Sequence, residues 1–277
     1  MKRPTVNIFG AVLLLIFAFL TLSAHFIAPF DLDERFAPYL RPSHIHRLGT
    51  DDMGSDIFSQ LVHGTKVSLL VGLITAAAAS ILGMVIGLFA GYSRGLADGL
   101  LMGVTDIFLM IPRIPLLIVL TAFIKPGILT LSLLFGLLWW PAVARVIRSR
   151  VLQVREAGFI KSAECLGFGK GFIVFSEILP NIIPLIIPKF MMTFAAAIIA
   201  EASISFLGLG DPMVKSWGMM INLAFMNGGF INGMWWWYGA PGICITLLVA
   251  AMVLLGMSLE PHKRSLTETD GSDKQKF

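Results

Sequence analysis

Long apolar runs separated by polar segments dominate the chain. Six windows of about 20 residues, the length of helix that crosses a bilayer core, are rich in apolar side chains and poor in charge. They are residues 8–28, 67–91, 100–124, 128–147, 182–206 and 240–259. None shows the alternation of a barrel strand, and backbone in lipid must satisfy its own hydrogen bonds. We therefore expect an all-α integral membrane protein with six transmembrane helices.

Composition agrees with this prediction and leaves little room for a soluble domain. The 277 residues are 56% hydrophobic and 14% charged. The expected outer segments are 29–66 and 207–239, and the expected cytoplasmic loop is 148–181. Segments this short do not fold alone unless disulfides, metal ions or oligomerisation stabilise them. We expect one transmembrane domain over residues 1–264. The polar tail, 265–277, lacks apolar periodicity and is expected to be disordered.

The distribution of basic residues predicts the orientation. Lys2 and Arg3 precede the first apolar run, which is longer than a signal-peptide core and is expected to stay as an anchor. Most other Lys and Arg residues fall in segments that share a side with this N-terminus. By the positive-inside rule both termini and the 148–181 loop are cytoplasmic. The same rule accounts for the pI near 9.2, so no nucleic-acid partner is expected.

Glycine and proline mark two of the predicted spans. Gly83, Gly87 and Gly91 recur every four residues, which predicts a helix face that another helix approaches closely. Pro112 and Pro115 interrupt the third span, and each removes a backbone donor. We expect a kink there, inside the bundle or beside a cavity.

The cytoplasmic loop contains a short amphipathic pattern. Phe159, Ile160, Ala163 and Leu166 lie on one helical face, and charged residues lie largely elsewhere. Gly167 suits a helix C-terminus. The pattern fits a helix that docks on a protein partner, and equally a helix that lies on acidic lipid.

Four stretches in a fixed order carry a family resemblance. They are LGTDDMGSDIFSQLVHGTKVSLLVGL at 48–73, WWPAVARVIRSRVLQVRE at 139–156, the series Lys161, Ser162, Ala163, Gly167 and Pro180, and EASISFLGLG at 201–210 followed by SWGMMI at 216–221. Over residues 45–262 the chain resembles permease subunits of type I ABC importers, specifically the second permease of the oligopeptide, dipeptide and nickel group. The Lys161 series falls at the spacing of that family's EAA loop. Lys161 stands where the family has an acidic residue.

The resemblance implies a set of partners. These are a second homologous permease, two cytoplasmic ATPase subunits, an extracytoplasmic substrate-binding protein and the lipid of a bacterial or archaeal cytoplasmic membrane. No cofactor is expected in this chain, because the sequence has no GxxxxGK[ST] loop, and ATP and Mg²⁺ would be bound by the ATPase partners. The chain would be a transport subunit, not an enzyme.

The resemblance also assigns ATPase coupling to particular residues. They are Arg155, Glu156, Phe159, Ile160, Lys161, Ser162, Ala163, Leu166 and Gly167. Among them, Phe159, Ala163 and Leu166 are expected to fill the ATPase groove. Peptides are the expected cargo, with nickel or a metal chelate on the same scaffold as the alternative. A stand-alone channel or intramembrane enzyme is the alternative of a different class, although the sequence has no HExxH motif.

Apart from Arg145, which is near the end of the 128–147 window and is counted with the basic residues of the cytoplasmic side, four charged residues fall inside the predicted spans: Asp106, Arg113, Lys189 and Glu201. A charge in the bilayer centre costs about 2.5–3.5 kcal/mol on insertion scales, so each should face the bundle or a wet cavity. Asp106 and Arg113 are separated by two turns and are expected to share a helix face, where they could pair through water or bind the second permease. Together with Glu201 they are the candidate polar groups of the pathway or bundle. Lys189 and Glu201 lie nearer the span ends, which favours a role at the membrane interface or in helix packing.

Aromatic, histidine and cysteine residues complete the set of candidates. Trp217 and the cluster from Trp235 to Tyr238 are typical of side chains that anchor a span at the headgroup layer. His44 and His46 are spaced for a shared metal, but two ligands make a weak site and a solvated outer loop is preferred. Cys165 and Cys244 fall on different sides of the membrane, so no disulfide is expected.

Overall fold

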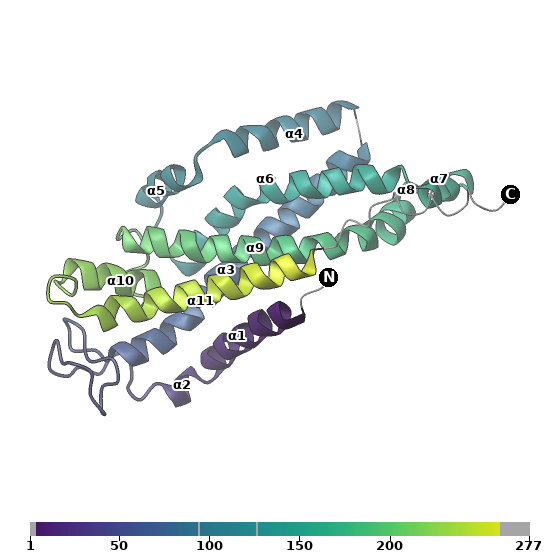
Figure 1. The fold of residues 1–277 in the computed structure, drawn as a ribbon. Helices are drawn as coiled ribbons and strands as arrows, with labels where there is room; N and C mark the ends of the chain where they lie inside the picture. Colours follow the sequence, from purple (N-terminus) through teal and green to yellow (C-terminus); the bar gives the residue numbers. More distant parts are fainter. Residues whose placement is uncertain (1–3, 94, 126, 261–277) are drawn as a thin grey trace, which may run out of the picture.

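The computed structural model describes residues 4–93, 95–125 and 127–260, and within these ranges the regular structure is helical (Figure 1). The elements are α1 (Pro4–Leu22), α2 (Ala24–Ile27), α3 (Ile57–Ser93), α4 (Gly95–Met110), α5 (Arg113–Phe123), α6 (Ile128–Arg155), α7 (Gly158–Cys165), α8 (Lys170–Phe172), the π-helix η1 (Ile173–Ile178), α9 (Leu179–Phe206), α10 (Trp217–Met226) and α11 (Trp235–Leu259). The predicted all-α fold is confirmed. The polar tail, 265–277, lies outside the described residues.

The predicted number of spans is matched in part. Four helical segments of the described chain are long and apolar enough to cross a membrane: α3, α6, the run Lys170–Phe206 and α11. Helices α4 and α5 pass the same test together but are bent by 86°, which makes a fifth span if the pair counts as one. The first predicted span corresponds to α1 and α2.

The long helices extend past their predicted ends. Helix α3 begins at Ile57 and α11 at Trp235, inside segments predicted as outer loops. Helix α6 continues to Arg155 and helix resumes at Lys170, so the predicted 148–181 loop shrinks to residues 156–169. A hydropathy window finds only the apolar part of a helix. Backbone hydrogen bonding carries the helix into polar sequence, where packing can still bury it.

The predicted glycine face is confirmed as the seam between α3 and α6, the pair of helices with the most extensive contact. A Cβ atom on Gly87 would lie 2.5 Å from the carbonyl oxygen of Ala144, and one on Gly83 would lie 2.6 Å from Cβ of Val143. Gly91 meets Val151 in the same way. The absence of side chains therefore lets the two helix backbones approach closely.

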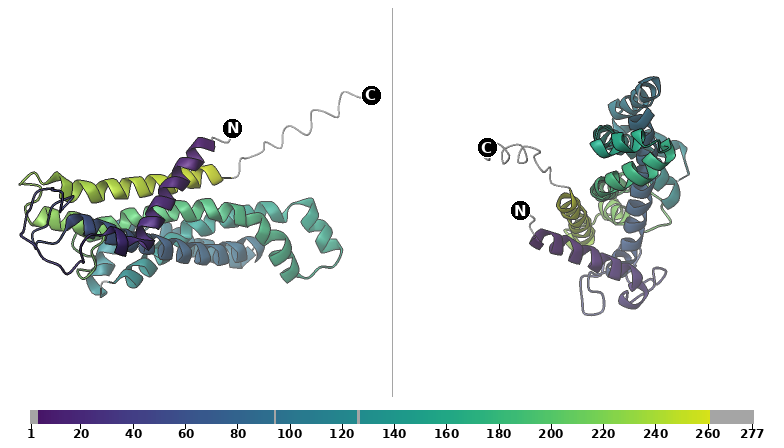
Figure 2. Two further views of the ribbon diagram at one scale, coloured as in Figure 1. Left: turned by 90° about the horizontal axis from the view of Figure 1, so that it is seen from below. Right: turned by 90° about the vertical axis from the view of Figure 1, so that its right-hand side faces the viewer.

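The helices form an elongated bundle with different structures at its two ends (Figures 1 and 2). Helices α3, α6, α9 and α11 run along its length, with α4 at one edge and α1 at the opposite edge. One end carries residues 28–56 and 207–234, including α10, which we name the cap. The other end carries α7 and α8.

The cap has a polar interior of its own. His46 is buried, contradicting the expectation of a solvated loop; its Nδ1 lies 3.0 Å from Asp56 Oδ1 and its ring packs against Phe30 and Phe36. His44 is exposed. Gln60 Nε2 donates to Asp51 Oδ2 at 2.6 Å, which ties the loop to the start of α3. Local turns bring these polar groups together and so remove them from solvent.

A second carboxyl joins the cap loop to α10. Asn227 Nδ2 donates to Asp52 Oδ2 at 2.7 Å. Burial raises the pKa of the Asp52 carboxyl and neighbouring Asp51 raises it further, while the hydrogen bond from Asn227 opposes the increase. The folded cap therefore binds a proton on Asp52 more tightly than the unfolded chain does.

Two tryptophans predicted to anchor the spans lie in the protein core instead. Trp217 and Trp237 are fully buried in one hydrophobic cluster, and Trp217 Nε1 donates to the Leu61 carbonyl at 3.0 Å. Trp235, by contrast, is 64% exposed. Sequence position places a tryptophan near the membrane interface but does not say which side of the helix faces the bundle, so the anchoring prediction is wrong for Trp217 and Trp237.

Candidate coupling loop and bundle polar groups

Helix α7 lies at the end of the bundle remote from the cap and ends in a defined structure. Gly167 has φ of +81°, its N–H donates to the Glu164 carbonyl at 3.0 Å, and the N–H of Phe168 donates to the Ala163 carbonyl at 3.2 Å. These two bonds form a Schellman motif, which satisfies carbonyls left free at a helix end. The predicted role of Gly167 as the C-terminal cap is confirmed.

Half of the apolar stripe of α7 is buried within this chain, and the other half is exposed. Ile160 and Ala163 are buried in a cluster with Val154 of α6 and with Ile173 and Ile178 of η1. Phe159 and Leu166 remain 46% and 77% exposed. The stripe therefore packs in part on its own bundle: Ala163, expected in the ATPase groove, is buried within this chain, while Phe159 and Leu166 stay exposed.

Charged residues of the loop have unequal structural roles. Lys161 Nζ lies 3.3 Å from Glu156 Oε2, and both side chains are more than half exposed, so the pair contributes about 0–1 kcal/mol. Arg155 instead donates from Nη1 to the Tyr92 carbonyl at 2.6 Å and lies over the ring of Tyr92. Arg155 therefore fastens the end of α6 to α3, and Lys161 and Ser162 stay on the exposed surface.

A pocket of about 700 Å³ adjoins α7 and the segment that follows it. It lies between the end of α3 and the segment that follows α7, and its lining includes Tyr92, Arg155 and Lys170. Nearby, Phe168 and Phe172 stack with their ring centroids 4.6 Å apart, and both are almost half exposed. An exposed aromatic surface beside cationic groups is typical of an interaction site.

Asp106 and Arg113 do not pair as predicted. The 86° bend places them on different helices, α4 and α5. Asp106 forms an ion pair with Arg145 of α6, and the guanidinium of Arg113 lies 5.2 Å from the ring centroid of Trp139. The prediction assumed one continuous helix. The backbone break at Pro112 turns the two side chains toward different parts of α6.

A second ion pair also joins α4 to α6. Arg148 donates from Nε and Nη2 to the two carboxylate oxygens of Asp98 at 2.5 and 2.6 Å. Both arginines, Arg145 and Arg148, lie within α6. Two parallel charge-assisted bonds fix orientation as well as distance, so this pair holds α4 alongside α6. The sequence offered one indication of this pair, because Asp98 is the one acidic residue in the first turn of α4.

Glu201 is buried near the cap end of α9. Its side chain is 4% exposed, and Ser205 Oγ donates to Oε1 at 2.6 Å. The packing role expected for Glu201 agrees with this position. Lys189, on the same helix, is half-buried.

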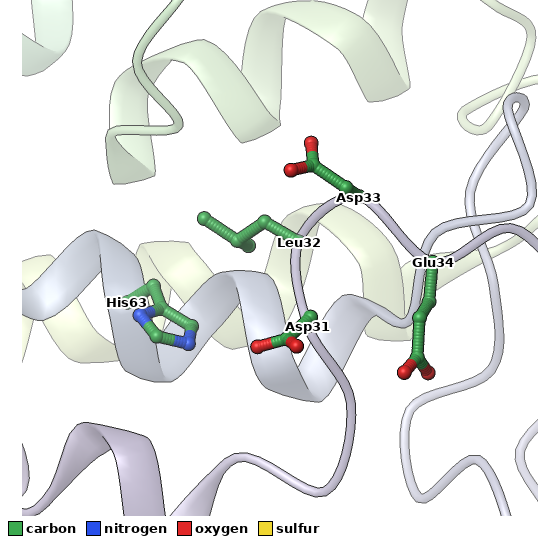
Figure 3. A pocket seen from close by; sticks show the side chains of 5 residues that line it. All are labelled: Asp31, Leu32, Asp33, Glu34 and His63. Carbon is green, nitrogen blue, oxygen red and sulfur yellow. The ribbon is translucent and has the colours of Figure 1, made fainter.

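The cap also contains an acidic pocket of about 430 Å³. Figure 3 shows Asp31 and Leu32 extending toward the side of α3 that carries His63, while Asp33 and Glu34 point in other directions. In the part of the chain that the structure describes, no group of three or more His, Cys, Asp or Glu side chains is placed to hold a metal ion. The divergent carboxylates in Figure 3 illustrate why.

Comparison with known protein families identifies the family of this chain. The family described as binding-protein-dependent transport system inner membrane component matches residues 83–262, which include α6, α7 and α9. The chain belongs to this family. The expected membership in the binding-protein-dependent ABC permeases is therefore confirmed.

Curated relatives of this permease carry names from one group of transport systems. The di/tripeptide transport system permease DppC of Pseudomonas aeruginosa is 32% identical over 259 residues, covering 90% of this chain and 84% of that protein. The dipeptide permease DppC of Bacillus subtilis is 32% identical, covering 86% and 73%. The glutathione permease GsiD of Pectobacterium atrosepticum is 34% identical, covering 80% and 75%. The permease is thus a multi-pass membrane component of an ABC transport system.

Proposed function

We propose that this permease forms half of the translocation pathway of an ATP-driven importer of peptides and receives ATPase motion through α7. The main support is the geometry of α7: a capped helix that exposes Phe159 and Leu166 while Ile160 and Ala163 anchor it. The sequence has no phosphate-binding loop, so partner subunits would supply ATP hydrolysis with Mg²⁺. Two such ATPases would bind at the α7 end, which would be cytoplasmic, as would both termini.

The packing suggests how movement of α7 would reach the far end. The cluster around Ile160 connects α7 to α6 and to η1, which continues into α9. The helical run Lys170–Phe206 spans 37 residues, or roughly 55 Å at 1.5 Å per residue. At its far end Asn222 Nδ2 of α10 donates to the Phe206 carbonyl at 2.7 Å. Rigid-body movement of α7 would therefore displace the cap, where an extracytoplasmic binding protein would deliver substrate.

The ion pair between Asp106 and Arg145 supports a second permease as partner. Both side chains are more than half exposed on this subunit. Such a pair facing hydrocarbon would be costly, so it is proposed to face the second permease or the aqueous pathway. Uptake by Asp106→Asn should fall relative to Asp33→Asn, an exposed cap variant, at matched expression. Equal uptake by the two variants would exclude this placement.

The choice of peptide as cargo rests on the relatives. Their names specify dipeptides, tripeptides and glutathione. Ligand analysis of the binding protein that co-purifies with this permease should recover short peptides. Recovery of a metal chelate instead would reject the peptide assignment while leaving the importer assignment intact.

Charge substitution on α7 tests the coupling proposal. Leu166→Asp should reduce co-purification of the ATPase subunits in mild detergent by about tenfold or more, because loss of a central interface anchor costs about 2 kcal/mol or more. Ile231→Asp is the matched control, since Ile231 is 91% exposed but lies in the cap. Association of the two permeases should survive both changes. Unaltered ATPase recovery with Leu166→Asp would contradict the proposal.

A further inference from the structure

The pocket of about 700 Å³ beside α7 has a cationic wall. Among the described residues that line it, Arg155 and Lys170 are basic and Glu164 is acidic, so the lining carries an excess of positive charge. The volume of the pocket is within the range of sites that bind small molecules. An anionic group placed in this pocket would therefore meet a favourable charge.

Both basic side chains of the lining keep hydrogen-bond donors for an anion. Arg155 donates from Nη1 to the Tyr92 carbonyl, which holds its guanidinium at the pocket wall and uses one of its five N–H groups. Lys170 is exposed at the start of α8, and within the part of the chain that the structure describes its ammonium group has no hydrogen-bond or ion-pair partner. Phosphate oxygens accept strong, charge-assisted hydrogen bonds from such groups.

The other walls of the pocket are aromatic. Phe89 and Tyr92 of α3 line it together with Phe168 of the segment after α7, and Phe168 stacks on Phe172. The rings of Phe89, Phe168 and Phe172 are exposed on this subunit. Aromatic side chains beside basic ones are typical of the boundary between hydrocarbon and water in a membrane. The pocket therefore combines a polar part, suited to an anion, with an apolar part that a small anion would leave uncovered.

An exposed apolar row on α3 continues from the pocket. Leu82, Val85 and Phe89 recur at i, i+3 and i+7, share one face of the helix and are all exposed. Val85 lies two residues, or about 200° around the helix, from both Gly83 and Gly87, the glycines of the seam with α6. The row therefore faces away from α6. Because α3 is long and apolar enough to span a membrane, the row provides an apolar track that begins at the pocket.

We propose that this pocket binds the headgroup of an anionic phospholipid, with an acyl chain of the same lipid along the row from Leu82 to Phe89. Basic pockets between membrane helices suit such headgroups. A free phosphate compound would neutralise the basic residues but leave the row exposed, whereas a zwitterionic lipid would cover the row but leave the excess charge unbalanced. Neither Phe159 nor Leu166 is among the described residues of the lining, so the lipid site is separate from the proposed ATPase contact.

Lipid binding to the assembled transporter tests this proposal. Native mass spectrometry counts the bound lipids as the complex is titrated in mild detergent with phosphatidylglycerol or with phosphatidylcholine of identical acyl chains. Wild type should bind phosphatidylglycerol about fivefold more tightly, because one net basic residue contributes about 1 kcal/mol toward an anionic lipid. Glycerophosphoglycerol, the same headgroup without acyl chains, should not displace the lipid at an equal concentration.

Two results would assign the pocket to another occupant and reject the lipid. Full displacement by glycerophosphoglycerol would mean that a free phosphate compound suffices. A preference for phosphatidylglycerol that appears only after the ATPase subunits are removed would mean that those subunits cover the pocket in the complex.

Charge variants of opposite sign make the test specific to the pocket. Lys170→Gln should weaken the binding of phosphatidylglycerol about fivefold, and Glu164→Gln should strengthen it by a similar factor, an opposition that a general change in packing would not produce. Lys66→Gln is the matched control, because Lys66 is an exposed lysine near the cap end of α3, and it should bind the lipid as wild type does. Equal affinity in all four proteins, or no preference of wild type for phosphatidylglycerol, would overturn the proposal.

The apolar row is tested by a change that leaves the charge constant. Phe89→Ala should weaken the binding of both lipids by a similar factor, whereas Phe123→Ala, a change of a highly exposed phenylalanine on α5, should not. Unchanged lipid binding by Phe89→Ala would reject the acyl-chain track. ATP hydrolysis is not measured in either titration, so failure of the α7 coupling proposal would leave these results unaffected.

Discussion

Replacing Gly167 offers a direct test of how the end of α7 is held. The residue has φ of +81° and no atom lies within 4 Å of a Cβ placed on it. A substitution there meets no steric barrier from neighbours, so its effect comes from the backbone conformation alone. Alanine should strain the Schellman motif, valine should strain it more, and asparagine should be tolerated best because it adopts left-handed conformations readily.

The chain can accommodate a substitution at Gly167 in two ways, and the free-energy cost of each is about the same. A residue with a Cβ in the left-handed region costs about 1–2 kcal/mol. Unwinding the end instead gives up the two bonds from Gly167 and Phe168, at about 1 kcal/mol each. Either route shifts the local equilibrium away from the capped helix by roughly 5- to 30-fold. Helix α7 has eight residues and little stability of its own, so this shift should be confined to the loop.

Transport-stimulated ATP hydrolysis by the reconstituted complex measures the consequence. Activity should fall in the order glycine, asparagine, alanine, valine, with at least a fivefold loss for alanine, while the subunits still assemble. Gly171→Ala is the matched control, because Gly171 also has open space around it but lies in α8. Activity that does not distinguish asparagine from valine, or a control as impaired as Gly167→Ala, would refute the reasoning.

Three further changes test the packing and the cap. Gly87→Ala should lower stability in detergent by about 1–3 kcal/mol because its Cβ meets a backbone oxygen of α6, whereas Gly103→Ala, in open space, should be neutral or stabilising by thermal unfolding. Arg148→Gln should cost about 1–2 kcal/mol by leaving Asp98 unpaired, and the double change to neutral residues should recover part of the loss in a double-mutant cycle. The raised pKa of Asp52 means that its protonation favours the fold, so wild type should gain stability relative to Asp52→Asn as pH falls toward the ordinary carboxyl value of 3.8, and lose that gain as pH rises through the folded pKa. A constant difference across pH in unfolding measurements would contradict this sign.

Local patterns predicted the elements whose identity depends on neighbouring residues in sequence. Apolar runs located the long helices, and four-residue glycine spacing located the seam between α3 and α6. The stripe before Gly167 predicted both α7 and its end, since a helix cap depends on residues within one turn. The α4–α5 break was also visible as Pro112 and Pro115, although its 86° angle was not.

Partners distant in sequence were decided by the tertiary structure. Asp106 pairs with Arg145 because of the bend, and Ala163 is buried because α7 folds back on η1. His46 is buried by aromatic rings of the same loop, and Trp217 by helices on both sides.

The sequence by itself determined that the protein is helical, that it belongs in a membrane and that it has a capped helix in the loop after α6. These properties follow from hydrophobicity and backbone geometry, which act over a few turns. The tertiary structure alone decided which charged groups are paired, which aromatic side chains are internal and that Glu201 is buried. A periodic pattern identifies a helix face, but the partner of that face depends on helix rotation and bending, which are set by packing across the whole bundle.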